Sequence, residues 1–243
     1  MDRYRADYYR SICNWNRELK METIVISIGG SVIVPDKIDT GFLKGLSGLI
    51  RKLGKRYRFI LVAGGGKTCR RYMDAAKAVK KISSDDLEWI GIRSTRLNAQ
   101  LLLALLKDIS WPKVIENPEK KIIAGEKVII AAGWKPGFSS DEIAVKLAKN
   151  HNAAILINIT DVGNVYDRDP DEFPDANPLE NLSWNEMKAI VGDKWKPGLN
   201  KPFGPMASKE AAKIRLKVII IGKDINNIER CITGKQFSGT TIA

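Results

Sequence analysis

The chain has 243 residues, of which 44% are hydrophobic and 28% are charged, and its formal net charge is +12. That length can bury a core in one large domain or in two small ones. No apolar run approaches the ~20 residues that cross a bilayer, and the first residues lack the apolar segment of a signal peptide. Basic residues are spread among acidic ones, which favours small anionic ligands over a nucleic-acid surface. We therefore expect a soluble, cytoplasmic protein that binds neither membrane nor nucleic acid.

The inventory of reactive side chains narrows the chemistry. The chain has a single histidine, His151, and three scattered cysteines, Cys13, Cys69 and Cys231. These argue against His-rich metal sites, histidine-based triads, a disulfide framework and a zinc site. Catalysis would have to use carboxylates, cations, backbone amides and a metal ion. Phosphoryl transfer is a reaction that uses this set, because it depends on positioning and charge stabilisation.

Strand and helix patterns alternate along most of the chain. Residues 1–20 are polar and aromatic with weak periodicity, and we treat them as an N-terminal extension; a single domain is expected over 21–243. The expected strands are 23–28, 58–63, 127–133, 153–160 and 217–222. The expected helices are 39–54, 67–81, 88–109, 139–151, 183–191, 207–216 and 226–234. Near-continuous Val and Ile strands between helices predict a three-layer α/β/α sandwich around a mostly parallel sheet.

Four segments rich in glycine or polar residues directly follow expected strands. They are 29–31, 64–66, 133–141 and 160–170. Ligands in open α/β sheets bind outside the carboxyl ends of the strands. A glycine after a strand is often only a turn, but four such segments at one edge of the sheet predict a cleft.

The triple glycine 64–66 is followed by three cations, Lys67, Arg70 and Arg71, before any acidic residue. The stretch is not a Walker A loop, because Leu61 occupies the position of the first glycine of that motif. Glycines nevertheless let backbone amides approach an anion at a helix N-terminus. Cations are unfavourable at that end of a helix unless an anion compensates them. We expect a bound anion here, and the alternative is a solvated basic face.

The segment 133–141, GWKPGFSSD, combines backbone amides with the cation of Lys135 and the hydroxyls of Ser139 and Ser140. These groups stand at an expected helix start, where an anion is favoured. We interpret the segment as a second anion site. The alternative is an ordinary capped helix, since Ser139 and Glu142 have the spacing of a capping box.

The segment 160–170, TDVGNVYDRDP, follows the expected strand 153–160. It places Asp161 just past a buried strand, where a carboxylate can orient lysines or bind magnesium. Tyr166 could stack on a base. The alternative interpretation is a hairpin with ordinary turn residues.

Taken together, these segments resemble the amino acid kinase superfamily and, within it, the archaeal-type uridylate (UMP) kinases. The resemblance rests on IGGSV, VAGGGKTCRRY, WIGIRSTRLNA, GWKPGFSSD, TDVGNVYDRDP and GTTI, in this order from about Glu22 to the end. It implies the three-layer fold, ATP and Mg²⁺ as cofactors, and a homohexamer. The reaction it implies is ATP + UMP → ADP + UDP by in-line phosphoryl transfer.

The resemblance also assigns roles to residues. Gly65 would contact UMP, and Glu88 stands where the family usually has an aspartate that holds the UMP ribose. The residues that would wrap UMP are Gly133, Trp134, Lys135, Pro136, Gly137, Phe138, Ser139 and Ser140. The residues that would contact ATP are Gly30, Ser31, Gly66, Arg70, Thr160, Tyr166 and Asp169. The expected catalytic residues are Asp161, Arg70 and Lys67, and no residue is assigned as a metal ligand.

The chain departs from the family pattern at three places. Many relatives carry a catalytic lysine where this chain has Ser27, and the cations that could replace it are Lys67, Lys135, Lys194 and Lys196. An acidic residue common in the 160–170 segment is absent at Gly163, and a later Asp-Pro pair is replaced at Gly204.

These departures leave two alternatives to a UMP kinase. One is a kinase of the same fold with another acceptor, such as a carboxylate or an isoprenoid phosphate. The other is a non-catalytic nucleotide-binding regulator. The isoprenoid kinases use a histidine near the glycine loop, which this chain lacks, and a carboxylate kinase would normally keep the lysine absent at Ser27.

Overall fold

The structure is a computed structural model that describes residues 21–120, 122, 125–168, 170, 172–192 and 203–243. The expected N-terminal extension 1–20 and the candidate ATP contact Asp169 therefore lie outside the described residues, as do Lys194 and Lys196.

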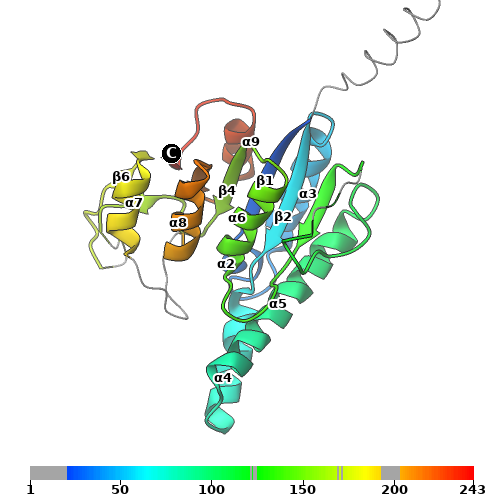
Figure 1. Ribbon diagram of the computed structural model, residues 1–243, viewed down its shortest axis with the longest axis vertical. Coiled ribbons are helices and arrows are strands. Elements are labelled where there is room, and N and C mark those ends of the chain that lie inside the picture. Colours follow the sequence, from blue (N-terminus) through cyan, green and yellow to red (C-terminus); the bar gives the residue numbers. More distant parts are fainter. Residues whose placement is uncertain (1–20, 121, 123–124, 169, 171, 193–202) are drawn as a thin grey trace, which may run out of the picture.

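The described residues form a seven-stranded sheet in the order β3-β2-β1-β4-β8-β9-β7 (Figure 1). Its strands are β1 (Glu22–Ile28), β2 (Tyr57–Ala63), β3 (Val128–Ala131), β4 (Ile155–Ile159), β7 (Asn181–Leu182), β8 (Lys217–Ile221) and β9 (Thr240–Ile242). Neighbouring strands run parallel except for the antiparallel pair β8 and β9. The sheet is therefore mostly parallel, as the Val- and Ile-rich strands predict.

Helices cover both faces of this sheet. The helices are α2 (Gly30–Ile33), α3 (Thr40–Leu53), α4 (Gly66–Val79), α5 (Ser84–Leu105), α6 (Ser140–Asn150), α7 (Trp184–Val191), α8 (Pro205–Lys213) and α9 (Ile225–Ile232). One apolar cluster joins α3, α5 and α9 to the sheet, and a second joins α6, α7 and α8 to it. Alternate strand residues divide between the clusters, since Ile24 and Ile26 belong to the first and Val25 to the second. The three-layer sandwich is confirmed.

The helix boundaries follow local sequence signals. Both expected capping boxes form, with Ser139 and Glu142 at the start of α6 and Ser183 and Glu186 at the start of α7. The structure adds elements that the periodicity did not indicate. They are the one-turn helix α2, strands β7 and β9, and a small antiparallel pair of β5 (Val165–Tyr166) with β6 (Pro178–Leu179). All are only two to four residues long, which is too short for a period of apolar residues to emerge.

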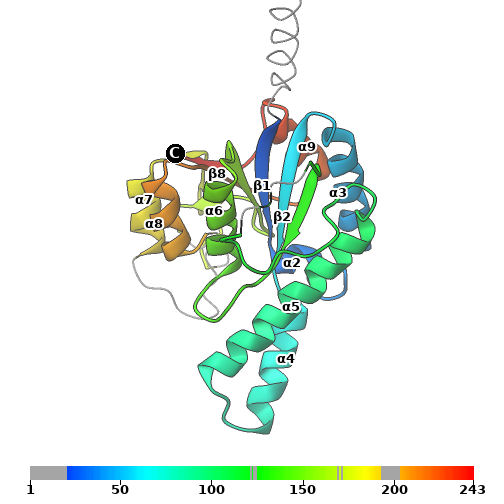
Figure 2. The ribbon, with the colours of Figure 1, turned by 45° about the vertical axis from the view of Figure 1, so that its right-hand side comes forward.

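Helix α4 and the first half of α5 project from the body of the molecule as a helical pair (Figures 1 and 2). Within α4 only Gly66 is buried, and this helix packs mainly against α5 and against the short helix α2. Helix α5 then continues onto the sheet, where Ala99, Leu102 and Leu103 join the first cluster. No helix among the described residues combines the length and the apolar composition that would let it span a membrane.

Candidate nucleotide-binding site

The glycine segments after β1 and β2 touch each other through their backbones. The two strands pair in register up to Ile28 and Ala63, so the segments that follow them emerge side by side. A Cβ atom on Gly30 would lie 1.9 Å from the backbone nitrogen of Gly66, and one on Gly64 would lie 2.4 Å from the nitrogen of Gly30. Only glycine permits this approach. The predicted ATP-phosphate segment and the triple glycine thus form one continuous surface.

Helix α5 fixes the triple glycine through Asn98. The buried Asn98 side chain donates from Nδ2 to the carbonyl oxygens of Gly64 at 2.7 Å and of Gly65 at 3.2 Å. Gly66 has a positive φ of 67° and begins α4. Sequence reasoning missed Asn98, although it lies within the stretch WIGIRSTRLNA on which the family resemblance partly rests.

The cations that follow the triple glycine do not act as one group. Arg71 Nη2 contacts Asp36 Oδ1 at 2.6 Å, and Lys67 Nζ lies 4.0 Å from the same oxygen. Arg70 is exposed, and among the described residues it has no ion-pair partner. Asp36 therefore lies within ion-pair distance of two of the three cations, and Arg70 remains available to an external anion.

The segment after β3 also rests on α5. The Gly133 N–H donates to Thr95 Oγ1 at 2.8 Å, and the Gly137 N–H donates to the carboxylate of Glu88. Arg96 donates to the carbonyl oxygens of Gly133 and Trp134. Glu88 thus contacts the predicted UMP-wrapping segment directly, while Thr95 and Arg96 are contacts that sequence reasoning missed.

Aromatic side chains shape the same segment. The Trp134 and Phe138 rings have centroids 4.9 Å apart, and both pack against the second apolar cluster. Lys135 Nζ lies 4.1 Å from the centroid of the Trp134 ring, which is within cation–π range. The Ser139 hydroxyl accepts the Glu142 N–H in the capping box, so it acts first as a helix cap.

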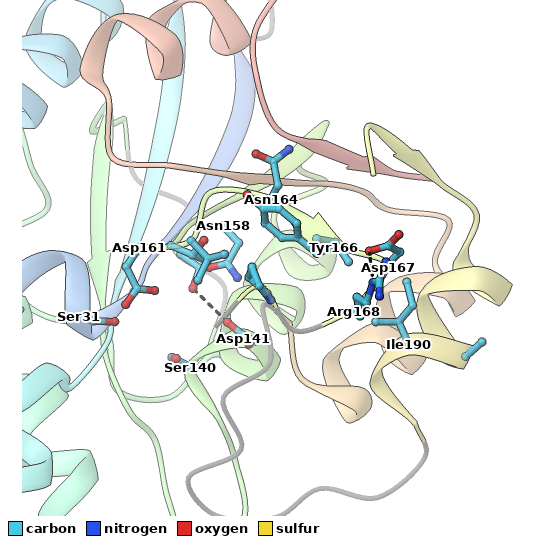
Figure 3. Close-up of a pocket in the computed structure, with 17 residues that line it drawn as sticks. Ser31, Ser140, Asp141, Asn158, Asp161, Asn164, Tyr166, Asp167, Arg168 and Ile190 are labelled. Carbon is cyan, nitrogen blue, oxygen red and sulfur yellow. Dashed lines mark hydrogen bonds and ion pairs between the residues drawn. The ribbon is translucent and has the colours of Figure 1, made fainter. Parts of the chain in front are cut away.

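A cavity of about 640 Å³ lies at the carboxyl ends of β1 and β4. Of the predicted ATP contacts, Ser31, Thr160 and Tyr166 line it, and so do the predicted catalytic Asp161 and the predicted UMP contact Ser140. Figure 3 shows Ser31 and Asp161 at one end of this group of side chains and Arg168 and Ile190 at the other, with Asp141 between them. Ser27, the position at which the family resemblance implies a catalytic lysine, also lines the cavity. Lining residues that sequence reasoning missed include Asp141, Asn158, Asn164, Arg168 and Ile190.

The other predicted residues lie around this cavity without lining it. Gly30 and Gly66 form the backbone contact described above. Gly65 belongs to the triple glycine, and Lys67 and Arg70 lie in the first turns of α4, which follows it. Gly133, Trp134, Lys135, Pro136, Gly137 and Phe138 form the segment held by α5, and Glu88 holds it there. The structure therefore separates the cavity from the triple glycine and the segment 133–138, and Ser140 reaches the cavity from the end of that segment.

Asp141 is the most perturbed carboxyl group of the cavity. It lies in the first turn of α6, where it accepts a hydrogen bond from Ser27 Oγ at 3.4 Å and another from the Gly204 N–H at 3.2 Å. Burial raises the pKa of Asp141 from 3.8 to about 6, against the lowering effect of these two hydrogen bonds. No described cation pairs with this carboxylate, and the residue that donates to it is Ser27, where the family resemblance implies a lysine.

The oxygen atoms of the cavity wall are of the type that magnesium prefers. Asp161 offers a carboxylate, and Ser31 and Thr160 offer hydroxyls. No group of three or more His, Cys, Asp or Glu residues that could hold a metal ion occurs within the described part of the chain. One carboxylate fits an ion that arrives with nucleotide phosphates, because Mg²⁺ is usually held by one or two carboxylates and by substrate oxygens.

Comparison with known proteins identifies the family of the chain. The family model described as "Amino acid kinase family" matches residues 22–222. The chain belongs to the amino acid kinase family. It is 36% identical over 225 residues to the uridylate kinase of Pyrococcus abyssi, covering 90% of this chain and 98% of that protein. It is 34% identical over 224 residues to the uridylate kinase of Thermoplasma volcanium, covering 91% and 97%. The crystal structure of the uridylate kinase from Archaeoglobus fulgidus matches with a TM-score of 0.79 and 28% identity, over 90% of this chain and 99% of that one.

Proposed function

We propose that this protein is a nucleoside monophosphate kinase that transfers the γ-phosphoryl group of ATP to UMP and so forms ADP and UDP. The observation that carries the proposal is the backbone contact between Gly30 and Gly66. This contact brings the Ser31 end of the cavity, where the ATP phosphates would lie, next to the triple glycine, where the acceptor phosphate would lie. Relatives that are uridylate kinases match nine-tenths of the chain, which supports the same activity here.

The two sides of the site divide the work. ATP occupies the 640 Å³ cavity with its base toward Tyr166 and Ile190 and its phosphates toward Ser31 and Asp161. UMP lies on the triple glycine and the segment 133–138. An oxygen of the UMP phosphate attacks the γ-phosphorus, and the bond to the β,γ-bridging oxygen of ATP breaks. Backbone N–H groups and Arg70 stabilise the negative charge on the transferring phosphoryl group. The acceptor needs no general base, because a phosphate monoester is already ionised.

Magnesium would be held by Asp161, with Ser31 and Thr160 nearby and the nucleotide phosphates completing its ligands. When bound, it neutralises charge on the β- and γ-phosphates. The protein groups themselves bind and orient the two nucleotides and exclude water from the space between them.

Two other functions of the same fold remain as alternatives. A kinase with another acceptor would release ADP with a carboxylate or an isoprenoid phosphate and not with UMP. A nucleotide-binding regulator would bind ATP or UMP without forming UDP, and the serine at position 27 is the feature that favours it. An ADP-release assay with a panel of acceptors, with and without Mg²⁺, separates the three.

The sharpest test of the proposal compares two adjacent arginines. Arg70 has no described ion-pair partner, whereas Arg71 contacts Asp36. We expect Arg70→Ala to lower kcat/KM for UMP by about a hundredfold, as expected for a group that stabilises transferring charge. Arg71→Ala is the matched control and should stay within about threefold, because an exposed ion pair contributes little to stability.

Equal kinetics of wild type and Arg70→Ala would count against the assigned role of Arg70. Equal losses in both variants would indicate a general loss of positive charge and not a specific contact.

We further propose that the enzyme works in the cytoplasm, where its nucleotide substrates are found, and that it assembles as a homohexamer, as the family resemblance implies. We also propose that 21–243 form one domain, with the acceptor bound by the N-terminal half and ATP by the C-terminal half. Sedimentation analysis would test the assembly, and a species smaller than a hexamer at working concentration would contradict it.

A further inference from the structure

We propose that Arg96 is a positioning residue for the acceptor nucleotide, which it does not touch: it turns the segment after β3 so that two backbone N–H groups face the acceptor. The proposal rests on the proposed function for the identity of the acceptor. The orientation of the segment itself depends only on contacts among α5, that segment and Glu116.

The guanidinium of Arg96 joins three parts of the chain. Its Nε donates to the Gly133 carbonyl at 3.1 Å, and its Nη2 donates to the Trp134 carbonyl at 2.8 Å. Its Nη1 lies 2.8 Å from Glu116 Oε2. The Arg96 side chain is only 17% exposed, whereas that of Glu116 is 52% exposed, so the guanidinium is mostly shielded from solvent and its ion pair lies toward the surface. A guanidinium group is planar and holds its charged N–H donors in a fixed arrangement. It therefore orients its acceptors more strongly than the single ammonium group of a lysine does.

Glu116 has a fixed position from which to hold the guanidinium. The preceding residue, Ile115, forms an isolated parallel bridge with Ala131 of β3. The Ile115 N–H donates to the Ile130 carbonyl at 2.8 Å, and the Ile115 carbonyl accepts from the Ala132 N–H at 3.0 Å. Glu116 therefore stands at the end of a short segment that is paired with the edge of the sheet.

The two carbonyl contacts determine where the neighbouring amides point. In a trans peptide the C=O and the next N–H point in opposite directions. With the carbonyls of Gly133 and Trp134 turned toward Arg96, the N–H groups of Trp134 and Lys135 are directed away from α5. No described residue accepts a hydrogen bond from either N–H. Successive free N–H groups of this kind bind anionic or carbonyl oxygens.

The remaining contacts of the segment cannot replace Arg96 in this role. Thr95 and Glu88 accept the N–H groups of Gly133 and Gly137, and neither side chain contacts the carbonyls of Gly133 and Trp134. Without the guanidinium, the carbonyls of Gly133 and Trp134 lose the hydrogen bonds that orient their peptide planes. The chemical class that the two N–H groups would recognise is an oxygen of UMP, from either its phosphate or its uracil carbonyls.

The test measures kinetics and hydrogen exchange on the full chain. Arg96→Met removes the donors and keeps the aliphatic stem, and we expect it to raise KM for UMP about tenfold with KM for ATP within twofold. Arg96→Lys restores one charged donor and should recover part of that loss. Arg93→Met is the matched control, because Arg93 is exposed on the same helix and lies over the Trp89 ring. It should leave both KM values unchanged.

Hydrogen exchange of the nucleotide-free protein separates this inference from the proposed function. In Arg96→Met the amides of Gly133 and Gly137 should exchange faster than in wild type, whichever acceptor the enzyme uses. Unchanged exchange together with an unchanged KM for UMP would overturn the role of Arg96. If wild type forms no UDP while exchange still rises in Arg96→Met, the proposed function fails and the positioning role stands.

A milder variant guards against a folding defect. Glu116→Gln keeps the arginine and its carbonyl contacts and removes only the ion pair. We expect it to raise KM for UMP two- to threefold. If Arg96→Met does not fold and Glu116→Gln changes neither KM for UMP nor the exchange of Gly133, the proposal is overturned.

Discussion

Replacing Asp141 with asparagine should stabilise the protein at neutral and alkaline pH. The folded protein holds the pKa of this carboxyl group at about 6, against an ordinary value of 3.8, because burial disfavours the charged form. Its stabilising contribution is therefore complete below pH 3.8 and is lost as the pH rises through about 6. The difference between the two pKa values corresponds to a cost of about 3 kcal/mol at pH 8 and of about 0.6 kcal/mol at pH 4.

An asparagine can satisfy both existing contacts of the carboxyl group. Its amide oxygen can accept from the Gly204 N–H, and its NH₂ group can donate to Ser27 Oγ, since a hydroxyl also accepts. We therefore expect the free energy of unfolding of Asp141→Asn to exceed that of wild type by up to about 3 kcal/mol at pH 8. The difference should shrink as the pH falls from about 6 to about 4.

Urea denaturation of both proteins at several pH values between 4 and 8 would measure this difference. If the variant is less stable than wild type at pH 8, or if the difference does not depend on pH, the burial argument is refuted.

Two further predictions concern the glycine segments. Gly30→Ala should destabilise the protein by at least 1–3 kcal/mol and weaken ATP binding, because its Cβ would lie 1.9 Å from the nitrogen of Gly66. Gly48→Ala, where a Cβ meets nothing within 4 Å on a helix, is the control and should stabilise by about 0.5–1 kcal/mol. Thermal unfolding would measure the stability of both variants, and calorimetric titration would measure their affinity for ATP. Equal stability and equal affinity in the two variants would contradict the prediction. Asn98→Asp removes the donor to the Gly64 carbonyl and should cost about 2 kcal/mol and raise KM for UMP; wild-type stability in urea would exclude that role.

The sequence determined the elements whose cause is local. The observed elements lie within a few residues of the sequence patterns that predict them. These patterns are the Val- and Ile-rich runs of the strands, the apolar periods of the helices and the capping boxes at Ser139 and Ser183. The sheet therefore appeared with the predicted strands, give or take a few residues at their ends. The rule that ligands bind at the carboxyl ends of strands then placed Ser31, Thr160 and Tyr166 at one edge, and the structure has all three in one cavity.

Contacts between distant parts of the chain decided the rest of the site. Asp141 was present in the quoted segment GWKPGFSSD, but nothing local marks it as a partly buried partner of Ser27, which is 114 positions away. The same holds for Arg96 and Asn98, whose acceptors are backbone carbonyls that any sequence possesses.

The cluster of cations after the triple glycine shows the difference most clearly. The local sequence places Lys67, Arg70 and Arg71 together at a helix start, and only the family resemblance singles out Lys67 and Arg70. In the fold, Asp36 from the loop between α2 and α3 contacts Arg71 and lies within ion-pair distance of Lys67, whereas Arg70 has no described ion-pair partner. Local sequence determines which backbone a segment adopts, because helix and strand signals act within a few residues. Only the tertiary structure decides which charge stays available to a ligand, because that depends on which distant side chains come within a few ångströms.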